Sequence, residues 1–424
     1  MIRTLTLCLL CLTICSGSDW TRFRGPGGTG VSEDTGLPRV WDTKENVAWK
    51  ATLPGFGSSS PITLGERIFL TCYAGYGFDA DEPGDQSRLT QHTLCLDRAT
   101  GRIRWSRSIE PRLPETDYAD GRIDLHGYAS ATPVTDSQAV YVFFGKSGVF
   151  KYSLDGELMW QTSVGSDIDS HNWGSGASPI LHNDLLIVNA SAESQSIRAL
   201  DTDTGKERWR VDEIVDSWST PLVVSAADGS EELVVVERSK VLGLDPATGQ
   251  TLWYYEKPSD YVCPSVIAHQ DVVYLINSRF KALLMAIRVG GQGDIAESHV
   301  LWSKRWTTRV STPVYHEGYL YGIDFRGRAY CINAQSGETV YQERLNISGS
   351  GDKIYASLVA GDGKIYGVSR LDGTVVLALE PRFQLLAHNH LGDDSVFNAT
   401  PTVSNGQLLL RSDRALYCIG RQTQ

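Results

Sequence analysis

The sequence lacks any hydrophobic run long enough to cross a membrane comfortably as a helix. Its N-terminal apolar run, from Leu5 to Ile14, is shorter than the roughly 20 residues that such a helix requires, and no other candidate occurs. The run follows Arg3 and precedes small residues at 16–18, which is typical of a secretory signal. We therefore predict a signal peptide over residues 1–18, an N-terminal extension over 19–45, and export to the periplasm, the cell surface or the medium.

Motifs of several enzyme classes are also missing. The chain contains no Gly-x-Ser-x-Gly nucleophile motif, no phosphate-binding glycine loop and no Cys-x-x-Cys-His haem motif, which argues against the corresponding chemistries. No basic stripe stands out, and Asp and Glu number 50 against 39 Lys and Arg. Nucleic acid is therefore not expected as a partner.

Cysteine is used sparingly and without the pattern of a disulfide scaffold. Of the eight cysteines, three lie in the predicted signal peptide, where lipidation of Cys15 stays open, and five remain. Equivalent positions of different repeats hold Cys95, Cys331 and Cys418, where other repeats have small residues, so we interpret these three as packing residues. A disulfide between Cys72 and Cys95, on adjacent predicted strands, stays open as an alternative.

What the sequence does contain is an internal repeat of about 45 residues, a period that indicates an array of similar units. Each unit begins with a strand that is usually headed by proline. The clear copies start at Pro61, Pro133, Pro179, Pro221, Pro313 and Pro401, and weaker copies start at Val266 and Leu358.

Each repeat reads as four short strands separated by turn residues. An Asp or Asn ends the third strand of most copies, a glycine follows it, and a tryptophan often lies four residues after the glycine. Units of this kind without helical stretches predict an all-β, eight-bladed β-propeller over residues 46–424, with four antiparallel strands per blade. The last copy lacks a fourth strand, and we expect an N-terminal strand around Trp49 to supply it and close the ring.

The motif Asp-x-x-Thr-Gly-x-x-x-Trp, present at 97–105 and 245–253, resembles the tryptophan-docking motif of the quinoprotein-like, PQQ-repeat propeller family. That family includes pyrroloquinoline quinone (PQQ) dehydrogenases and outer-membrane assembly scaffold lipoproteins of bacteria. The segments 19–26 and 28–31 resemble the start of secreted PQQ-like repeat proteins of planctomycete type. The resemblance and the repeat together assign a structural docking role to Trp49, Trp105, Trp160, Trp209, Trp253 and Trp302.

The residues that the repeat does not explain gather at one predicted face. The inner strand comes first in each blade, so the residues ahead of it, the long segment 110–128 and the acidic insertion 74–91 should open together around the central channel. The candidate binding residues at this face are His126, Tyr128, His171, Trp173, Trp218, Tyr261, Trp306, Arg309, Tyr355 and Phe397. Aromatic and charged side chains around one mouth suit a protein or ligand surface, although ordinary channel-filling side chains would give the same pattern.

Two functions remain open at this stage. The first is an exported, non-catalytic, envelope-associated propeller that binds a partner protein or a small ligand through this face, with no cofactor, no metal site and no catalytic residue. The alternative is a PQQ-dependent dehydrogenase that oxidises an alcohol or a sugar with PQQ and calcium. The resemblance implies an adjacent Cys-Cys pair against the quinone in such enzymes, and this sequence has no Cys-Cys dipeptide. The binding function is therefore favoured.

Overall fold

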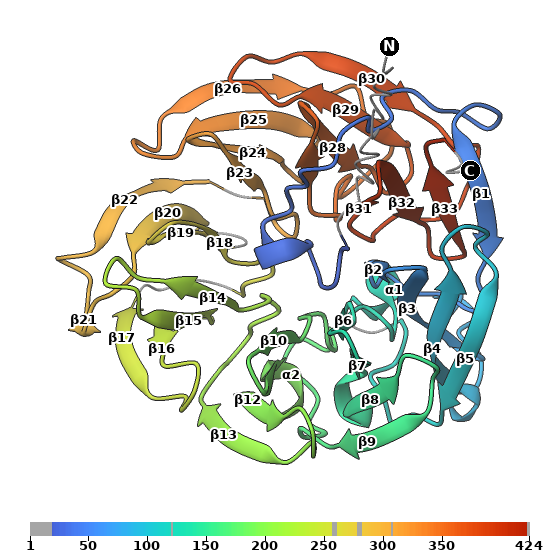
Figure 1. Cartoon of the computed structure of the whole chain (residues 1–424), viewed down its shortest axis with the longest axis horizontal. Coiled ribbons are helices and arrows are strands. Elements are labelled where there is room, and N and C mark those ends of the chain that lie inside the picture. The colour runs from blue at the N-terminus through green and yellow to red at the C-terminus, as the bar shows by residue number, and fades with distance from the viewer. Residues whose placement is uncertain (1–18, 120–121, 257–260, 278–281, 307, 422–424) are drawn as a thin grey trace, which may run out of the picture.

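The strands of the molecule form eight separate sheets arranged as blades around a common axis (Figure 1). The computed structural model describes residues 19–421 except 120–121, 257–260, 278–281 and 307, so the predicted signal peptide and Cys15 lie outside the described residues. The described helical elements are short: α1 (Ile123–His126), α2 (Ser191–Ser194), η1 (Pro26–Gly28), η2 (Gln86–Arg88) and η3 (Gly145–Ser147). The predicted all-β, eight-bladed propeller is confirmed.

The blades follow one another in chain order, and each is built on four antiparallel strands with the first strand at the axis (Figure 1). Blade 1 holds β2 (Ile62–Leu64), β3 (Arg67–Ala74), β4 (Thr90–Asp97) and β5 (Ile103–Ile109). Blade 2 holds β6 (Val134–Thr135), β7 (Ala139–Phe143), β8 (Val149–Ser153) and β9 (Leu158–Thr162). Blade 3 holds β10 (Ile180–His182), β11 (Leu185–Ala190), β12 (Ser196–Asp201) and β13 (Glu207–Asp212). Blade 4 holds β14 (Leu222–Ser225), β15 (Glu231–Val236), β16 (Lys240–Leu244) and β17 (Thr251–Glu256).

The second half of the ring repeats this plan. Blade 5 holds β18 (Ile267–His269), β19 (Val272–Ile276), β20 (Leu283–Arg288) and β22 (Val300–Arg305). Blade 6 holds β23 (Val314–His316), β24 (Tyr319–Ile323), β25 (Arg328–Asn333) and β26 (Thr339–Arg344). Blade 7 holds β27 (Val359–Gly361), β28 (Lys364–Val368), β29 (Thr374–Ala378) and β30 (Leu385–Asn389). Blade 8 holds β31 (Thr402–Ser404), β32 (Gln407–Arg411), β33 (Ala415–Ile419) and β1 (Val47–Thr52).

One blade departs from the predicted four strands. A two-residue strand, β21 (Gly293–Asp294), pairs in parallel with β17 and makes blade 4 five-stranded. It comes from the connection between β20 and β22, where the repeat has an insertion in place of its usual short turn. The insertion covers Trp253, which is fully buried and donates from Nε1 to Glu232 at 2.6 Å.

The N-terminal strand closes the ring as predicted, because β1 pairs antiparallel with β33 from Val47↔Ile419 to Thr52↔Ala415. Two buried arginines also join blade 8 to blade 1. Arg411 donates to Ser59 O and Thr71 O, both at 2.6 Å, and Arg98 donates to Ser404 Oγ at 2.6 Å. The ring is therefore closed by the sheet of blade 8, to which β1 and β33 both contribute, and by buried polar contacts between blades 8 and 1.

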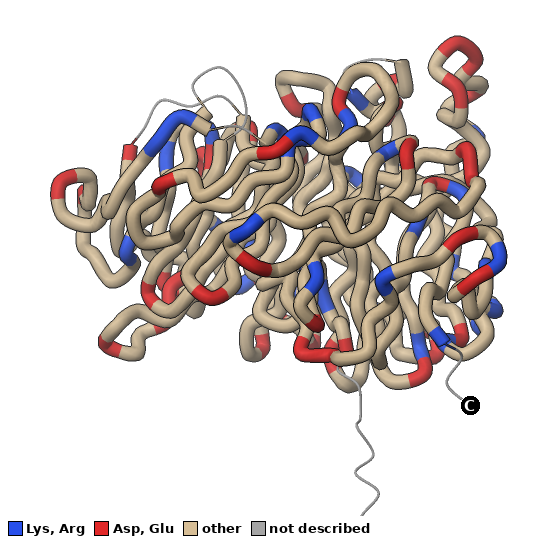
Figure 2. Tube along the Cα trace, turned by 90° about the horizontal axis from the view of Figure 1, so that it is seen from above, with Lys and Arg blue, Asp and Glu red and all other residues tan. Residues whose placement is uncertain are grey.

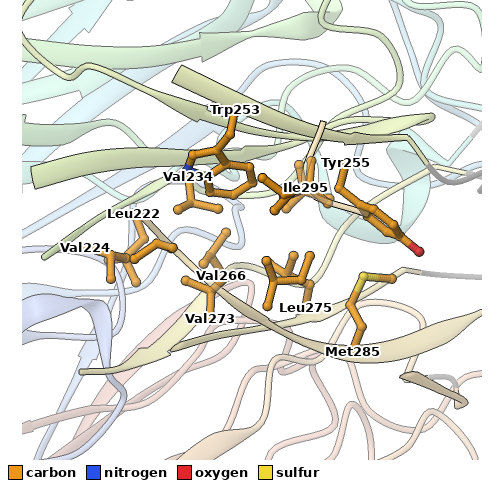
Figure 3. Packing of buried hydrophobic residues seen from close by; sticks show 14 of the residues in the cluster. Leu222, Val224, Val234, Trp253, Tyr255, Val266, Val273, Leu275, Met285 and Ile295 are labelled. Atoms are coloured by element: carbon orange, nitrogen blue, oxygen red, sulfur yellow. The ribbon is translucent and has the colours of Figure 1, made fainter. Parts of the chain in front are cut away.

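The core consists of eight apolar clusters, and each cluster joins two neighbouring blades. Figure 3 shows the one between blades 4 and 5, in which Val234 and Trp253 face Val273 and Leu275. Each blade buries both faces in this way, so its middle strands read as continuous apolar runs.

Tryptophans of the repeat pack against a turn of the following blade. Trp105 donates from Nε1 to Leu154 O at 3.0 Å, and a Cβ on Gly156 would come within 2.8 Å of the Trp105 ring. Because Gly156 also has a φ of +86°, the turn favours glycine both for its backbone conformation and for the space that the ring occupies. The same indole-to-carbonyl hydrogen bond occurs at Trp49, Trp160, Trp209 and Trp302.

The N-terminal extension crosses the axis of the ring (Figure 1). Backbone hydrogen bonds join Thr63 of blade 1 to Trp20 and Thr135 of blade 2 to Thr21, both at 2.9 Å. The extension then meets blade 7 on the other side, where Ala360 N donates to Gly30 O at 2.8 Å. This segment therefore crosses the channel and does not run along the outer wall.

The open alternative of a disulfide between Cys72 and Cys95 is not realised. Both cysteines are buried and free, because Cys72 lies opposite His92 and Cys95 opposite Phe69 in the β3–β4 pairing. Burial raises the pKa of Cys72 to about 11 and that of Cys95 to about 12. Both thiols therefore stay protonated and act as packing groups.

Basic and acidic residues are interspersed along the side of the ring (Figure 2). Among the described residues, no helix is long and apolar enough to span a membrane.

Candidate functional site

A belt of hydroxyl side chains surrounds the axis of the ring. A serine or threonine stands directly ahead of the position that heads each repeat. From Thr132 round to Thr400, its hydroxyl oxygen accepts from the backbone N–H of the equivalent residue in the preceding blade, at 2.9–3.2 Å. The belt residues are Ser60, Thr132, Ser178, Thr220, Ser265, Thr312, Ser357 and Thr400. The belt couples neighbouring blades where they approach the axis.

All eight belt residues line a pocket of about 180 Å³ that we call the mouth pocket. It opens at the face where the inner strands begin and where the loops between second and third strands gather. The crossing extension contributes Phe23 to its lining. The mouth pocket is therefore a cup whose base is the N-terminal extension.

The base of the cup is held by one buried guanidinium. Arg24 donates to four backbone carbonyls, those of Gly28, Thr29, Thr312 and Pro313, at 2.7–3.2 Å. Burial, followed by the nearby positive charge of Arg22, lowers the pKa of Arg24 to about 9. Arg24 thus remains charged at neutral pH and fastens the extension to blade 6.

Aromatic side chains cluster on one side of the pocket. The Trp173 ring lies 4.5 Å from that of Tyr261 in an edge-on arrangement and 4.9 Å from that of Trp218. Trp218 donates from Nε1 to Gly174 O at 2.6 Å, and the Asp169 carboxylate accepts from the backbone N–H groups of Trp173 and Gly174. These hydrogen bonds fix the orientation of the cluster.

Charged side chains occupy the other side. Arg309 Nη1 lies 2.6 Å from both carboxylate oxygens of Asp352, and Arg122 Nη1 lies 4.0 Å from the same carboxylate. Arg122 also stacks over the Trp173 ring at 5.5 Å, which joins the charged side to the aromatic side. Arg309 has a φ of +66°, a sparsely populated conformation that often marks functional positions.

His126 ties two blades together at the edge of the pocket. Its Nδ1 lies 2.6 Å from Ser130 Oγ and its Nε2 lies 2.9 Å from Trp173 O. Desolvation lowers the pKa of His126, so the ring is neutral near pH 7. Both nitrogens already have partners, and His126 is not available as a metal ligand in this arrangement.

The structure brings six of the ten candidate residues into the lining of the mouth pocket: His126, Trp173, Trp218, Tyr261, Arg309 and Tyr355. His171 lies behind them, where it packs on Trp173 and lies 3.3 Å from Asp216. The other three point elsewhere. Tyr128 donates to Thr116 O, Trp306 packs edge-on against Tyr330 in the core between blades 5 and 6, and Phe397 packs on Tyr417.

The sequence interpretation missed Arg122, Asp352 and the hydroxyl belt. The belt had a visible signal, because a serine or threonine stands directly before the first position of every repeat. Arg122 and Asp352 lie in connections that follow no repeat, so their approach depends on the folded loops.

The pocket does not fit a calcium-bound quinone of the kind that the family resemblance implies. Calcium takes six to eight oxygen ligands, whereas Asp352 is the one carboxylate among the described residues lining the pocket, and Arg309 engages both of its oxygens. Cys263 also lines the pocket, but it has no adjacent cysteine.

Comparison with solved structures places the fold among two kinds of propeller. BamB from Moraxella catarrhalis is 14% identical, with a TM-score of 0.60, over 89% of this chain and 98% of that chain. Quinohemoprotein alcohol dehydrogenase from Comamonas testosteroni is 10% identical, with a TM-score of 0.68, over 96% of this chain and 81% of that chain. At these identities the likeness is one of fold.

Among curated proteins, the tetrathionate hydrolase of Acidithiobacillus ferrooxidans is 22% identical over 252 residues, which are 56% of this chain and 44% of that protein. The matches to curated relatives span less than half of the relatives' own length.

The family described as outer membrane protein assembly factor BamB matches residues 90–343, which is more than half of the chain. With the eight blades and the repeated tryptophan turns, this match shows that the chain belongs to that PQQ-repeat propeller family.

Proposed function

We propose that this protein is an exported, non-catalytic propeller that binds a partner protein at the mouth pocket and its rim. The observation that carries the proposal is the cluster of Trp173, Trp218 and Tyr261 beside Arg122 and Arg309 at one opening. Tryptophan, tyrosine and arginine dominate the binding energy of protein interfaces. Their concentration beside a pocket supports a binding face.

The hydrogen bonds and ion pairs that Asp352 and His126 already make favour a binding function over catalysis. A general base must be within reach of a substrate proton and free to accept it. Asp352 is paired with Arg309, and His126 is engaged at both ring nitrogens. These two groups are thus engaged in holding the rim in shape.

The size of the pocket favours a protein partner over a free small molecule. Clefts for drug-sized ligands commonly measure roughly 300–1,000 Å³, whereas the mouth pocket measures about 180 Å³. One or two inserted side chains of a docked protein suit this volume. The family description, an outer membrane assembly factor, agrees with an envelope partner and with the predicted signal peptide.

A paired comparison of variants tests the binding face. Native envelope extract would be passed over the wild-type protein, over the variant W173A/W218A/R309A, and over D184A/K206A/E338A, whose substituted residues are exposed and lie near turns at the opposite ends of the strands. Each protein would first be shown to retain the wild-type melting temperature within a few degrees. We expect capture of one specific protein by the wild type and the control, and a loss of at least fivefold with the mouth variant. Equal capture by all three would contradict the proposal.

A second measurement tests the absence of catalysis. The wild-type protein would be titrated with PQQ and calcium chloride while absorbance and dye reduction by alcohols and sugars are followed. We expect no saturable, calcium-dependent PQQ binding and no turnover. Saturable binding with alcohol- or sugar-dependent dye reduction would show a quinoprotein dehydrogenase and overturn the proposal.

A further inference from the structure

Two histidines stand side by side on the outer edge of blade 7. His388 lies near the end of β30 and His390 directly follows that strand. Residues two apart along a strand point to the same face. Accordingly, the two imidazole rings lie with their centroids 4.5 Å apart.

A carboxylate from the neighbouring strand connection joins them. Asp372 lies between β28 and β29, and its carboxylate oxygens lie 4.0 Å from His388 Nε2 and 3.9 Å from His390 Nδ1. His388 Nε2 also hydrogen-bonds to the backbone carbonyl of Asp372, and an ion bound at Nε2 would replace that hydrogen bond, whereas no side chain would have to leave the site. One ligand atom from each of the three residues falls within 4.8 Å of the other two. Neighbouring donors around a tetrahedral ion with bonds of about 2.1 Å are roughly 3.4 Å apart, so modest side-chain rotations would bring these three onto one ion.

The backbone holds the carboxylate against the histidine strand. Gly373 has a φ of +73°, and a Cβ at that position would lie 2.1 Å from Asn389 O and 3.0 Å from His390 Nδ1. Only glycine therefore allows the connection to approach β30 this closely. Ser348 N–H donates to Asp372 Oδ2 at 2.6 Å, which orients the carboxylate as an outer hydrogen bond orients a metal ligand.

There is room for additional ligands beside the three side chains. His390 lines a second pocket, of about 150 Å³, together with Gly373, Thr374 and Asp394. This pocket is large enough for the water molecules that complete the coordination of an ion. The side chain of His390 is about half exposed, at 55%, so the site is reachable from solvent.

From these contacts we propose that Asp372, His388 and His390 form a binding site for a divalent first-row transition-metal ion such as Zn²⁺. Two imidazole nitrogens with one carboxylate suit zinc, nickel, cobalt or copper, whereas calcium and magnesium prefer all-oxygen sites. The site lies at the outer edge of the ring and is separate from the mouth pocket, so it does not depend on the proposed binding function.

Cobalt and zinc titrations test the site directly. Tag-free protein covering residues 19–424 would be freed of metal with a chelator and titrated with Co²⁺, with the visible absorption of the bound ion as the signal, and then with Zn²⁺ in competition. We expect one strong site whose Co²⁺ spectrum indicates four- or five-coordination and which Zn²⁺ displaces. Zn²⁺ should also raise the melting temperature of the wild type, because binding to the folded state alone stabilises it.

Variants locate the ion. His390→Ala, which removes a half-exposed side chain, and Asp372→Asn should each weaken Zn²⁺ binding at least tenfold and abolish the rise in melting temperature. His299→Ala is the matched control, since His299 is another partly exposed histidine, hydrogen-bonded to Ser298, and this variant should bind as the wild type does. Absence of saturable binding, or wild-type affinity in both His390→Ala and Asp372→Asn, would overturn the proposal.

Discussion

At the scale of single residues, buried arginines donate hydrogen bonds to backbone carbonyls, which no apolar side chain could do. Arg24 satisfies four backbone carbonyls at the base of the mouth pocket, and Arg411 satisfies carbonyls of blade 1 from blade 8. A carbonyl that is buried without a donor costs about 1–3 kcal/mol. The guanidinium group is suited to this task because it presents five donors on one plane.

Replacing Arg24 should therefore destabilise the protein strongly. We expect R24A to lower the free energy of unfolding by roughly 3–5 kcal/mol, because it removes a buried charged donor and leaves its acceptors unpaired. Urea denaturation followed by tryptophan fluorescence measures the change. R39A is the control, since Arg39 donates to Leu386 O at an exposed position, and it should cost less than about 1 kcal/mol. Equal effects of the two substitutions would refute the assigned role of Arg24.

Two carboxyl groups with raised pKa values, those of Glu193 and Glu115, give the stability a defined pH dependence. Burial raises the pKa of Glu193 and that of Glu115 to about 7, and for Glu115 the charge of Glu193 adds to the rise. The folded state thus holds protons that the unfolded state releases near pH 4.5. This contribution to stability is complete below about pH 4.5 and is lost as the pH rises through 7.

Glu193→Gln mimics the protonated acid and should prevent part of the loss of stability that the wild type shows as the pH rises through 7. At pH 8 we expect E193Q to be more stable than the wild type by roughly 1–3 kcal/mol, whereas the two proteins should be alike at pH 4.5. Melting curves from pH 4.5 to 8 measure the difference, with E66Q, at an exposed turn of blade 1, as the control. A wild-type advantage at pH 8 would contradict the assignment.

At the scale of elements, the connection between one blade and the next rests on a tryptophan and a glycine turn. Gly101 and Gly363 have nearly the same φ, +69° and +68°. A Cβ on Gly101 would lie 2.6 Å from the Trp49 ring, whereas a Cβ on Gly363 would meet nothing within 4 Å. Substitutions at these two glycines therefore separate the energy of the docking contact from the cost of the backbone conformation.

Gly101→Ala should therefore cost roughly 1–3 kcal/mol more than Gly363→Ala, because both substitutions strain the backbone and only the first displaces a docked ring. Thermal or urea unfolding of the two variants measures this difference. If both variants lost the same stability, the Trp49 contact would carry no weight in closing the ring.

Strands, blade number and closure could be predicted because they follow from local patterns that recur in every unit. The pairing of the strand around Trp49 with the segment 415–419 could be predicted as well. The last repeat lacks a fourth strand, and the strand around Trp49 belongs to no repeat of its own. The parallel strand β21 could not be predicted, because the insertion that forms it occurs once. The course of the N-terminal extension across the axis could not be predicted either, because it depends on contacts of Arg24 with residues nearly 300 positions away in sequence.

The candidate site was predicted as a region, with less success in its details. The position ahead of each inner strand places a residue near the mouth, which explains Trp173, Trp218 and Tyr261. Side-chain direction depends on the connection that precedes it, and so Trp306 packs into the core against Tyr330 at 5.0 Å. The contact between Asp372 and His390 joins two loops of one blade, and the His-x-His pattern at 388–390 was its one sequence signal.

At the scale of the whole molecule, the closed ring separates two faces. The inner strands run away from the mouth pocket, so the turns between first and second strands, such as the one at Asn183, lie at the opposite face. The N-terminal extension crosses between these faces and forms the base of the pocket. A partner that uses the mouth pocket should therefore approach from one side only.

Site-specific photo-cross-linking from both faces tests this central claim most directly. A photoreactive amino acid would replace Leu125, which lines the mouth pocket, or Asn183, in native envelopes. We predict one specific cross-linked partner from position 125, a loss of at least fivefold when W173A/W218A/R309A is also present, and only background from position 183. Equal cross-linking from both positions, or a position-125 product that the triple variant leaves unchanged, would contradict a binding function of the mouth pocket.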